Sequence, residues 1–436
     1  MISTVRGVST LFMGIAFLML GNGLQGSLLA VRATLEDFGT TVTGIVMSSY
    51  YLGFLISSIV TPKLVTDVGH IRVFAAFASI ASAAVLVHSM VPEPIVWFGL
   101  RFFTGVAIAG LYVVCESWLN QTASNEERGK VFSLYMIVVA GCMGIGQFIL
   151  PLADPSGHTL FIVVSIFVSV ALVPISLSRS PAPTVVTLER LGLLELYRLS
   201  PLGVVSCFLI GIAQGGLFSL GPVYATELDF NTTEIAVFMA LPFFVLILIQ
   251  FPIGALSDRM DRRPVIAGVA IVAAASSALV GVFAGQNVTL VYAFFAVFGA
   301  CAMSLYGLTI AHANDAMPTE KILPASAMLV LVYAVGSFGG PTITGLAMSQ
   351  LGNDWFLWLG TAIHLAIAAY ALYRMTQRAA TPGDERGEYV PVLGRTTGIA
   401  QVAAIEAVGE EGGWITYEED ETSEEDEAVP TQAEEK

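Results

Sequence analysis

The stretch GALSDRMDRRP, residues 254–264, places five charged side chains in six consecutive positions, and an apolar run lies on each side of it. Such a dense group of charges is unusual in this chain. It has 436 residues, of which 55% are hydrophobic and 12% are charged, about half the charged share of an average soluble domain. A short charged loop between long apolar runs is typical of a connection at a membrane surface. The composition therefore predicts an integral membrane protein.

Twelve apolar stretches fill the first 375 residues. Each is close to the ~20 residues that cross a hydrocarbon core as a helix. The fold class predicted is therefore an all-α integral membrane protein, and the first stretch is expected to remain as an anchor helix instead of being removed as a signal peptide. The expected spans are 8–30, 41–61, 71–91, 95–117, 131–151, 158–178, 201–224, 232–256, 265–285, 288–310, 322–349 and 355–375.

Lys and Arg residues predict the orientation of these spans. If the N-terminus is cytoplasmic, the outer loops hold only Arg32, and the inner segments hold the other loop and tail cations, Arg6, Arg179 and Arg190 among them. Positive charge accumulates on the cytoplasmic side of membrane proteins. We therefore expect both termini to be cytoplasmic.

The chain changes character after Arg374. Residues 376–436 carry 16 acidic and 4 basic side chains, and they contain no apolar run long enough to cross a membrane or to build a core. We predict an acidic, disordered cytoplasmic tail with an unknown partner. Removal of residues 380–436 is expected to leave the function of the membrane part intact.

An internal repeat organises the rest of the chain. At an offset of about 190, TDVGHIR (66–72) matches SDRMDRR (257–263), so that Asp67 pairs with Asp258 and Arg72 with Arg263. Six predicted helices separate the copies, and an even number gives the two halves the same orientation in the membrane. We expect a six-helix bundle at 1–178, a cytoplasmic linker at 179–200 and a second bundle at 201–375. Further matches are Gln25 with Gln214, Phe102 with Phe294, Tyr112 with Tyr306 and Asn120 with Asn314.

These features resemble the major facilitator superfamily, whose two parallel six-helix halves each carry the loop Gly-x-x-x-Asp-Arg-x-Gly-Arg-Arg. The resemblance covers residues 1–375. In the second copy, Asp261 replaces the second glycine of the motif, and the matching residues are Gly254, Asp258, Arg259, Arg262 and Arg263.

The first copy departs further from this motif. It keeps Asp67, Gly69 and Arg72, but Lys63 and Val68 stand at the first glycine and the first arginine. The stretches ESWLN (116–120) and GEYVPVLGR (387–395) are similar to those of the bacterial YcaD-type branch of the superfamily.

The resemblance implies a secondary active transporter in the bacterial inner membrane, in which two halves rock about a central solute site. A helix C-terminus carries partial negative charge, so the Asp and Arg residues of the two loops can bridge to neighbouring helix ends as cytoplasmic latches. The alternative is that they only set the topology. We expect a small polar solute, neutral or anionic, with a proton or a sodium ion as coupling ion. Alternatives are a drug or metabolite efflux transporter and a non-transporting sensor that acts through the acidic tail.

Polar side chains inside the spans are the candidate site residues, because such groups are costly in lipid and usually face a cavity. Arg101 and Glu116 lie on one predicted helix, about 22 Å and about 60° apart. We expect Arg101 to bind solute or to be a structural arginine. Glu116, near the cytoplasmic rim, is expected to be a gate residue more than a proton site. Asn22 and Gln25 share one helix face, and Gln214 is the repeat partner of Gln25; these amides are solute ligands or interhelical hydrogen-bond partners.

Other functional classes lack support in the sequence. The chain contains no His-Glu-x-x-His and no Gly-x-Ser-x-Gly sequence, so we do not expect an enzyme. The four cysteines lie in or at the ends of apolar spans without metal-ligand spacing, and we expect no metal site and no cofactor. No basic patch favours nucleic-acid binding.

Overall fold

The computed structural model describes residues 2–122, 125–176, 191–379 and, further along, residues 382, 386, 387, 389 and 391–394. Within them, twelve helices are long and apolar enough to cross a membrane, which confirms the predicted fold class. Residues 179–190 of the expected linker and residues 380, 381, 383–385, 388, 390 and 395–436 of the tail lie outside the described residues. The twelve helices are α1 (Ile2–Leu35), α2 (Gly39–Val68), α3 (His70–Met90), α4 (Pro94–Thr122), α5 (Asn125–Gln147), α6 (Thr159–Ser176), α8 (Pro201–Glu227), α9 (Thr232–Arg259), α10 (Arg262–Phe283), α11 (Val288–Asn314), α12 (Ile322–Leu351) and α13 (Trp355–Gln377).

Helix packing repeats between α1–α6 and α8–α13. In the first set α1 packs on α5 and α6, α2 on α4, and α3 on α4 and α6. In the second set α8 packs on α12 and α13, α9 on α11, and α10 on α11 and α13. Each pair therefore has a counterpart six spans later. A short helix, α7 (Leu193–Leu199), precedes α8 at the start of the second set.

Glycines let the paired backbones approach, and these contacts repeat as well. A methyl group on Gly23 or Gly146 of the first half would collide with a backbone oxygen across the α1–α5 contact. Gly211 and Gly336 are in the same situation across the α8–α12 contact. Small residues are the usual means of close helix packing in lipid, where burial of apolar surface does not hold helices together.

The two halves contact each other through the pairs α2 with α12, α5 with α9, α1 with α8, and α2 with α8. The first third of α2 packs on the last third of α12, where Thr40 Oγ1 donates a 3.1 Å hydrogen bond to the Gly345 oxygen, and Ser48 and Thr342 share one of 2.8 Å. Between α5 and α9, the ring of Phe148, directly after α5, and the ring of Phe244 in α9 stack with their centres 6.3 Å apart.

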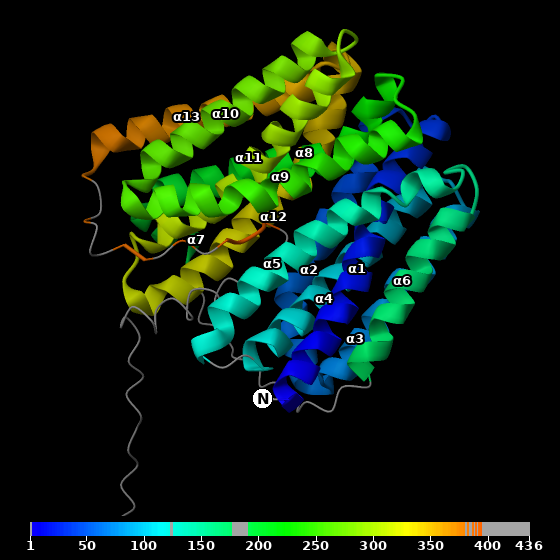
Figure 1. Cartoon of the computed structure of the whole chain (residues 1–436), viewed down its shortest axis with the longest axis horizontal. Helices are drawn as coiled ribbons and strands as arrows, with labels where there is room; N and C mark the ends of the chain where they lie inside the picture. Colours follow the sequence, from blue (N-terminus) through cyan, green and yellow to red (C-terminus); the bar gives the residue numbers. More distant parts are fainter. Residues whose placement is uncertain are drawn as a thin grey trace, which may run out of the picture.

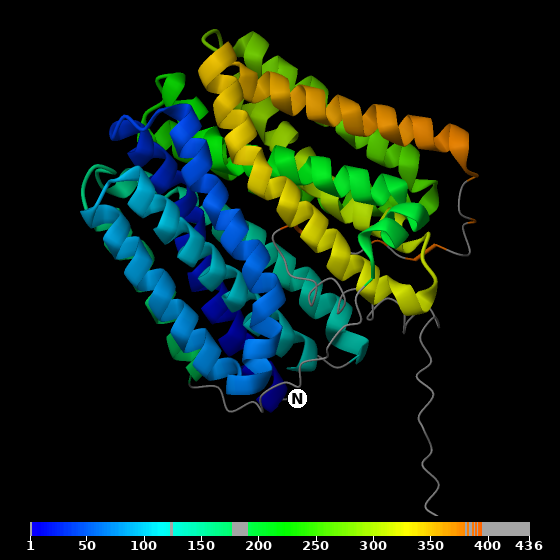
Figure 2. The same ribbon diagram turned by 180° about the vertical axis from the view of Figure 1, so that it is seen from behind.

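The halves converge at the end of the bundle where α2 begins and α12 ends. They diverge toward the end that carries the charged loops (Figures 1 and 2). We name the end with residues 68–70 and 259–262 the motif end, and the end with residues 35–39 and 351–355 the opposite end. The helices of the two halves therefore lie together at the opposite end and spread apart at the motif end.

Closure at the opposite end depends on a glycine contact that a larger side chain should prevent. A methyl group on Gly345 would collide with the Thr40 backbone oxygen, and only separation of α2 from α12 relieves a backbone collision. We expect Gly345→Val to open this end, so that Ser48→Cys, which is buried here, reacts with a membrane-impermeant maleimide. The matched control is Gly339→Val on the same helix, where the added carbon meets only the end of the Ile343 side chain at 3.6 Å. Equal labelling of Ser48→Cys in both backgrounds would refute the role of this contact.

Candidate functional site

Two amide side chains of α1 are buried without partners for their nitrogen atoms. Asn22 and Gln25 are 8% and 2% exposed. Neither Asn22 Nδ2 nor Gln25 Nε2 has a hydrogen-bond partner among the described residues. A buried donor left unpaired costs about 1–3 kcal/mol. The pair therefore offers two free donors near the middle of α1.

Gln214 of α8 differs, because both ends of its amide are bonded. Its Nε2 donates to the Ala302 oxygen at 2.9 Å, and its Oε1 accepts from the Tyr333 hydroxyl at 2.9 Å. The ring of Tyr306 meets that of Tyr333 edge-on at 4.9 Å. This network joins α8, α11 and α12.

The amide nitrogens of Gln25 and Gln214 therefore have different surroundings. Gln25 Nε2 has no hydrogen-bond partner among the described residues, whereas Gln214 Nε2 is bonded to the Ala302 oxygen.

Arg101 of α4 is buried against an aromatic face. Its guanidinium carbon lies 4.4 Å from the centre of the Tyr50 ring of α2, a cation–π contact. The sequence predicted that Arg101 either binds solute or is a structural arginine. A tyrosine on the neighbouring helix was missed, because helix periodicity does not reveal which faces of α2 and α4 meet.

Glu116 is fully buried within the first half. α4 continues six residues beyond it to Thr122, and the side chain is 0% exposed. The Tyr135 hydroxyl of α5 donates a 2.7 Å hydrogen bond to Glu116 Oε1. The carboxyl therefore lies between α4 and α5 inside the first half.

Arg262 is the centre of the second charged loop. The side chain is 1% exposed and bonds Asp315 Oδ2 at 2.7 Å, Asp258 Oδ1 at 3.1 Å and Ser257 Oγ at 2.8 Å. Burial raises the pKa of Asp315, against the opposing effect of the Arg262 charge. The loop thereby ties the end of α9 to the end of α11 within the second half.

Arg263 ties the same loop to the end of α13. It bonds Asp261 Oδ2 at 2.7 Å, and its Nη1 donates to the backbone oxygens of Arg378 at 2.8 Å and Arg374 at 3.3 Å. Cations are favourable at a helix C-terminus. Burial would raise the pKa of Asp261, but the bonds from Arg263 outweigh it and the pKa is lowered.

The first charged loop makes fewer contacts. Asp67 and Arg72 are exposed, and no hydrogen bond or ion pair is found for either in the described part of the chain. His70, buried beside them, shares a 3.0 Å hydrogen bond with Ser117 of α4. The fuller motif of the second loop thus has the denser bonding, while Arg259 is exposed.

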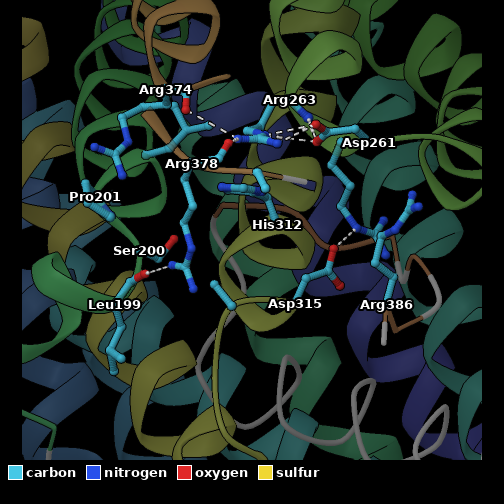
Figure 3. A pocket seen from close by; sticks show the side chains of 14 residues that line it. Leu199, Ser200, Pro201, Asp261, Arg263, His312, Asp315, Arg374, Arg378 and Arg386 are labelled. Atoms are coloured by element: carbon cyan, nitrogen blue, oxygen red, sulfur yellow. Dashed lines mark hydrogen bonds and ion pairs between the residues drawn. The ribbon is translucent and has the colours of Figure 1, made fainter. Parts of the chain in front are cut away.

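A pocket at the motif end of the second half is strongly basic (Figure 3). Its lining combines the second charged loop, the ends of α11 and α13, and the tail. Carboxylates of Asp261 and Asp315 offset part of the charge. The arginines that line it are Arg262, Arg263, Arg374, Arg378 and Arg386.

Part of the tail is docked against this end of the second half. The Tyr389 N–H donates to Asp258 Oδ1 at 2.9 Å, and the Gly387 N–H donates to Asp315 Oδ1 at 3.2 Å. Pro391, Val392 and Gly394 are buried. The expectation of a disordered tail does not describe these residues, because the apolar run around Val392 is too short to span a membrane but long enough to fill a groove.

Comparison with known proteins assigns the family. The model of the Major Facilitator Superfamily matches residues 11–251 and 204–409. The chain belongs to this superfamily of transporters, as the resemblance of its charged loops implied.

Among relatives, an uncharacterised MFS-type transporter of Yersinia enterocolitica, YE1530, is 24% identical over 89% of this chain and 99% of its own length. The uncharacterised MFS-type transporter YcaD of Escherichia fergusonii is 24% identical over 80% of this chain and 91% of its own. A mutant form of the nucleoside transporter NupG shares the fold with a TM-score of 0.70 at 13% identity, covering 85% of this chain and 99% of that one. The human organic anion transporter MFSD10 gives 0.59 at 13% identity, covering 84% and 99%.

Replacing Arg262 should destabilise the fold, because it leaves the buried Asp315 carboxylate unpaired. Loss of one partner of a buried ion pair costs about 3–5 kcal/mol, so we expect Arg262→Gln to lower the thermal midpoint of the purified protein clearly. Arg259→Gln, which changes an exposed arginine of the same loop, should leave the midpoint nearly unchanged. Similar midpoints for both variants would show that the Arg262 contacts do not support the second half.

Proposed function

We propose that this protein is a secondary transporter that moves a small polar organic solute, neutral or anionic, by alternating access. The solute site lies between the halves at mid-height, and Asn22, Gln25 and Gln214 contribute to it. The observation that carries the proposal is the pair of buried, unpartnered amide nitrogens on α1. In a bundle that must satisfy its polar groups internally, two such donors favour a ligand that supplies oxygen acceptors.

The solute class follows from this chemistry. Amide N–H groups bind carbonyl, hydroxyl or carboxylate oxygens, which both neutral and anionic metabolites carry. NupG is a nucleoside transporter and MFSD10 an organic anion transporter, so transporters of the same fold act on both kinds of solute. Arg101 would add a positive charge to the site, although its contact with Tyr50 also supports a structural role.

We infer that the motif end lies in the cytoplasm of a bacterial cell. Cationic residues gather at this end, with five arginines around one pocket, as the positive-inside rule requires. In this orientation the protein faces inward, with its periplasmic end closed by the α2–α12 and α5–α9 contacts. The second charged loop then acts as the stronger of two cytoplasmic latches when the protein turns outward.

Glu116 is the candidate for proton coupling. It is a fully buried carboxyl that accepts a hydrogen bond from Tyr135, a residue of α5, and α5 contacts α9 of the other half. A change in the α4–α5 packing during transport would alter this hydrogen bond and with it the proton affinity of the carboxyl. The proton would thereby be coupled to the motion of α5.

Ligand-induced stabilisation tests the site. We expect at least one compound from a panel of nucleosides and short carboxylates to raise the thermal midpoint of the purified full-length protein, because a ligand that binds only the folded state stabilises it by mass action. Gln25→Leu should abolish this shift without lowering the midpoint of the unliganded protein, since it removes an unpaired buried amide. Gln286→Leu, an exposed control, should keep the shift. A full shift in Gln25→Leu would exclude Gln25 from the site.

Substitution of Glu116 tests the coupling. Glu116→Gln keeps the shape and the acceptor for Tyr135 but cannot carry a proton on and off. We expect uptake of the bound compound into proteoliposomes to lose its response to an imposed pH gradient, while exchange of solute across the membrane continues. Tyr135→Phe should shift the pH dependence instead of removing it. Gradient-driven uptake at the normal rate in Glu116→Gln would contradict the assignment.

A further inference from the structure

We propose that the docked part of the tail is an intramolecular plug that covers the solute site from the motif end and holds the protein open there. The plug comprises the described residues Arg386, Gly387, Tyr389 and 391–394. That it covers a solute site rests on the proposed function; that it occupies this surface rests on its own contacts.

The plug is anchored by the charges of the second loop. Asp258 and Asp315 accept the backbone N–H groups of Tyr389 and Gly387, and Arg262 donates to the Gly387 oxygen. The carboxylates that fix Arg262 thus also fix the plug backbone. Burial raises the pKa of Asp315 overall, while the positive charge of Arg386 lowers it. The Arg386 side chain of the plug is therefore attracted to the Asp315 carboxylate.

A notch formed by two glycines receives the Tyr389 ring. A methyl group on Gly254 of α9 would collide with the ring, and one on Gly307 of α11 would lie 2.8 Å from its hydroxyl oxygen. Burial raises the pKa of Tyr389. Gly254, the first residue of the charged-loop motif, therefore leaves the space that the Tyr389 ring occupies.

Beyond Tyr389 the plug reaches the candidate solute site. Pro391 and Val392 are buried, and a methyl group on Gly394 would lie 2.7 Å from the Tyr333 hydroxyl. That hydroxyl donates to Gln214. One side chain therefore separates the plug from the Gln214 amide.

The plug lies where the halves must meet when the motif end closes. α9 and α12, which carry Gly254 and Tyr333, are the helices that contact α5 and α2 at the opposite end. Figures 1 and 2 show the described tail residues passing from the end of α13 toward the space between the halves. Closure of the motif end along the same helix pairs requires the plug to leave, so the tail regulates the cycle and is not a passive extension.

Accessibility of Tyr333→Cys measures plug occupancy without any solute. The cysteine is placed in the full chain, in a chain ending at residue 380, and in a full chain with Tyr389→Ala. Its rate of reaction with a membrane-impermeant maleimide is then measured. The labelling of the native cysteines, measured in each background without Tyr333→Cys, is subtracted. If the plug is docked in about nine molecules in ten, the accessible fraction limits the rate, and we expect both changes to raise it about tenfold. Tyr389→Phe keeps the ring and should give the rate of the full chain.

Met90→Cys, an exposed site at the opposite end, is the matched control and should react equally in every background. Should the shortened chain fail to fold, Tyr389→Ala alone decides the outcome. Equal rates for Tyr333→Cys in the full chain and in Tyr389→Ala would overturn the plug. This result is independent of the solute panel, so the plug and the proposed transport activity can fail separately.

Cross-linking tests the docked position directly. The Gly254 carbon that a side chain would add lies 3.0 Å from Cγ of Tyr389, so the two Cβ atoms lie within the ~3.5–4.5 Å range that a disulfide spans. We expect Gly254→Cys with Tyr389→Cys to form an intramolecular disulfide on mild oxidation, and Gly254→Cys with Met90→Cys at the opposite end to remain reduced. Failure of the first pair, or equal yield in both, would contradict the docked geometry.

Discussion

Close approach of helix backbones at glycines is the constraint on which this structure depends. A lipid environment provides little drive to bury apolar side chains against one another, so dispersion contacts between closely packed backbones must hold the helices. Gly23 and Gly146 allow this between α1 and α5, and Gly211 and Gly336 allow it between α8 and α12. The same device recurs between the halves, where Gly44 and Gly345 admit backbone oxygens of the partner helix. Helix pairs that hold each half together and the contact that closes one end thus share one physical basis.

The two halves share their helix pairing but differ in the bonding of their side chains. Gln214 is bonded at both ends of its amide, whereas the Gln25 nitrogen has no partner among the described residues. The charged loops diverge in the same way. Arg262 is enclosed by two carboxylates, whereas Asp67 and Arg72 are exposed. Differences in a few side-chain contacts therefore distinguish two halves that share the same helix packing.

Much of the fold could be predicted from the sequence, because hydropathy over ~20 residues reports directly on membrane crossing. Matched landmarks such as Asp67 and Asp258 also revealed the repeat. Burial of Glu116 was missed, since hydropathy does not show that α4 continues to Thr122 or that Tyr135 faces it. Asp315 and Tyr333 were missed too, because their importance comes from contacts between helices distant in sequence. The docked tail was not predicted for a different reason. The extended segment around Val392 has no helical periodicity, and its few apolar residues lie beside a strongly acidic stretch that indicates disorder.

The central claim is that the halves are open at the motif end, closed at the opposite end, and held so by the tail. Distances between spin labels test it most directly, with one pair at Lys63 and Glu320 for the motif end and another at Asp37 and Asp354 for the opposite end, all exposed positions. For the full chain, the account predicts one long distance at the motif end and one short distance at the opposite end. When the chain ends at residue 380, a second population should appear, shorter at the motif end and longer at the opposite end. A short motif-end distance in the full chain, or identical distributions with and without the tail, would contradict it.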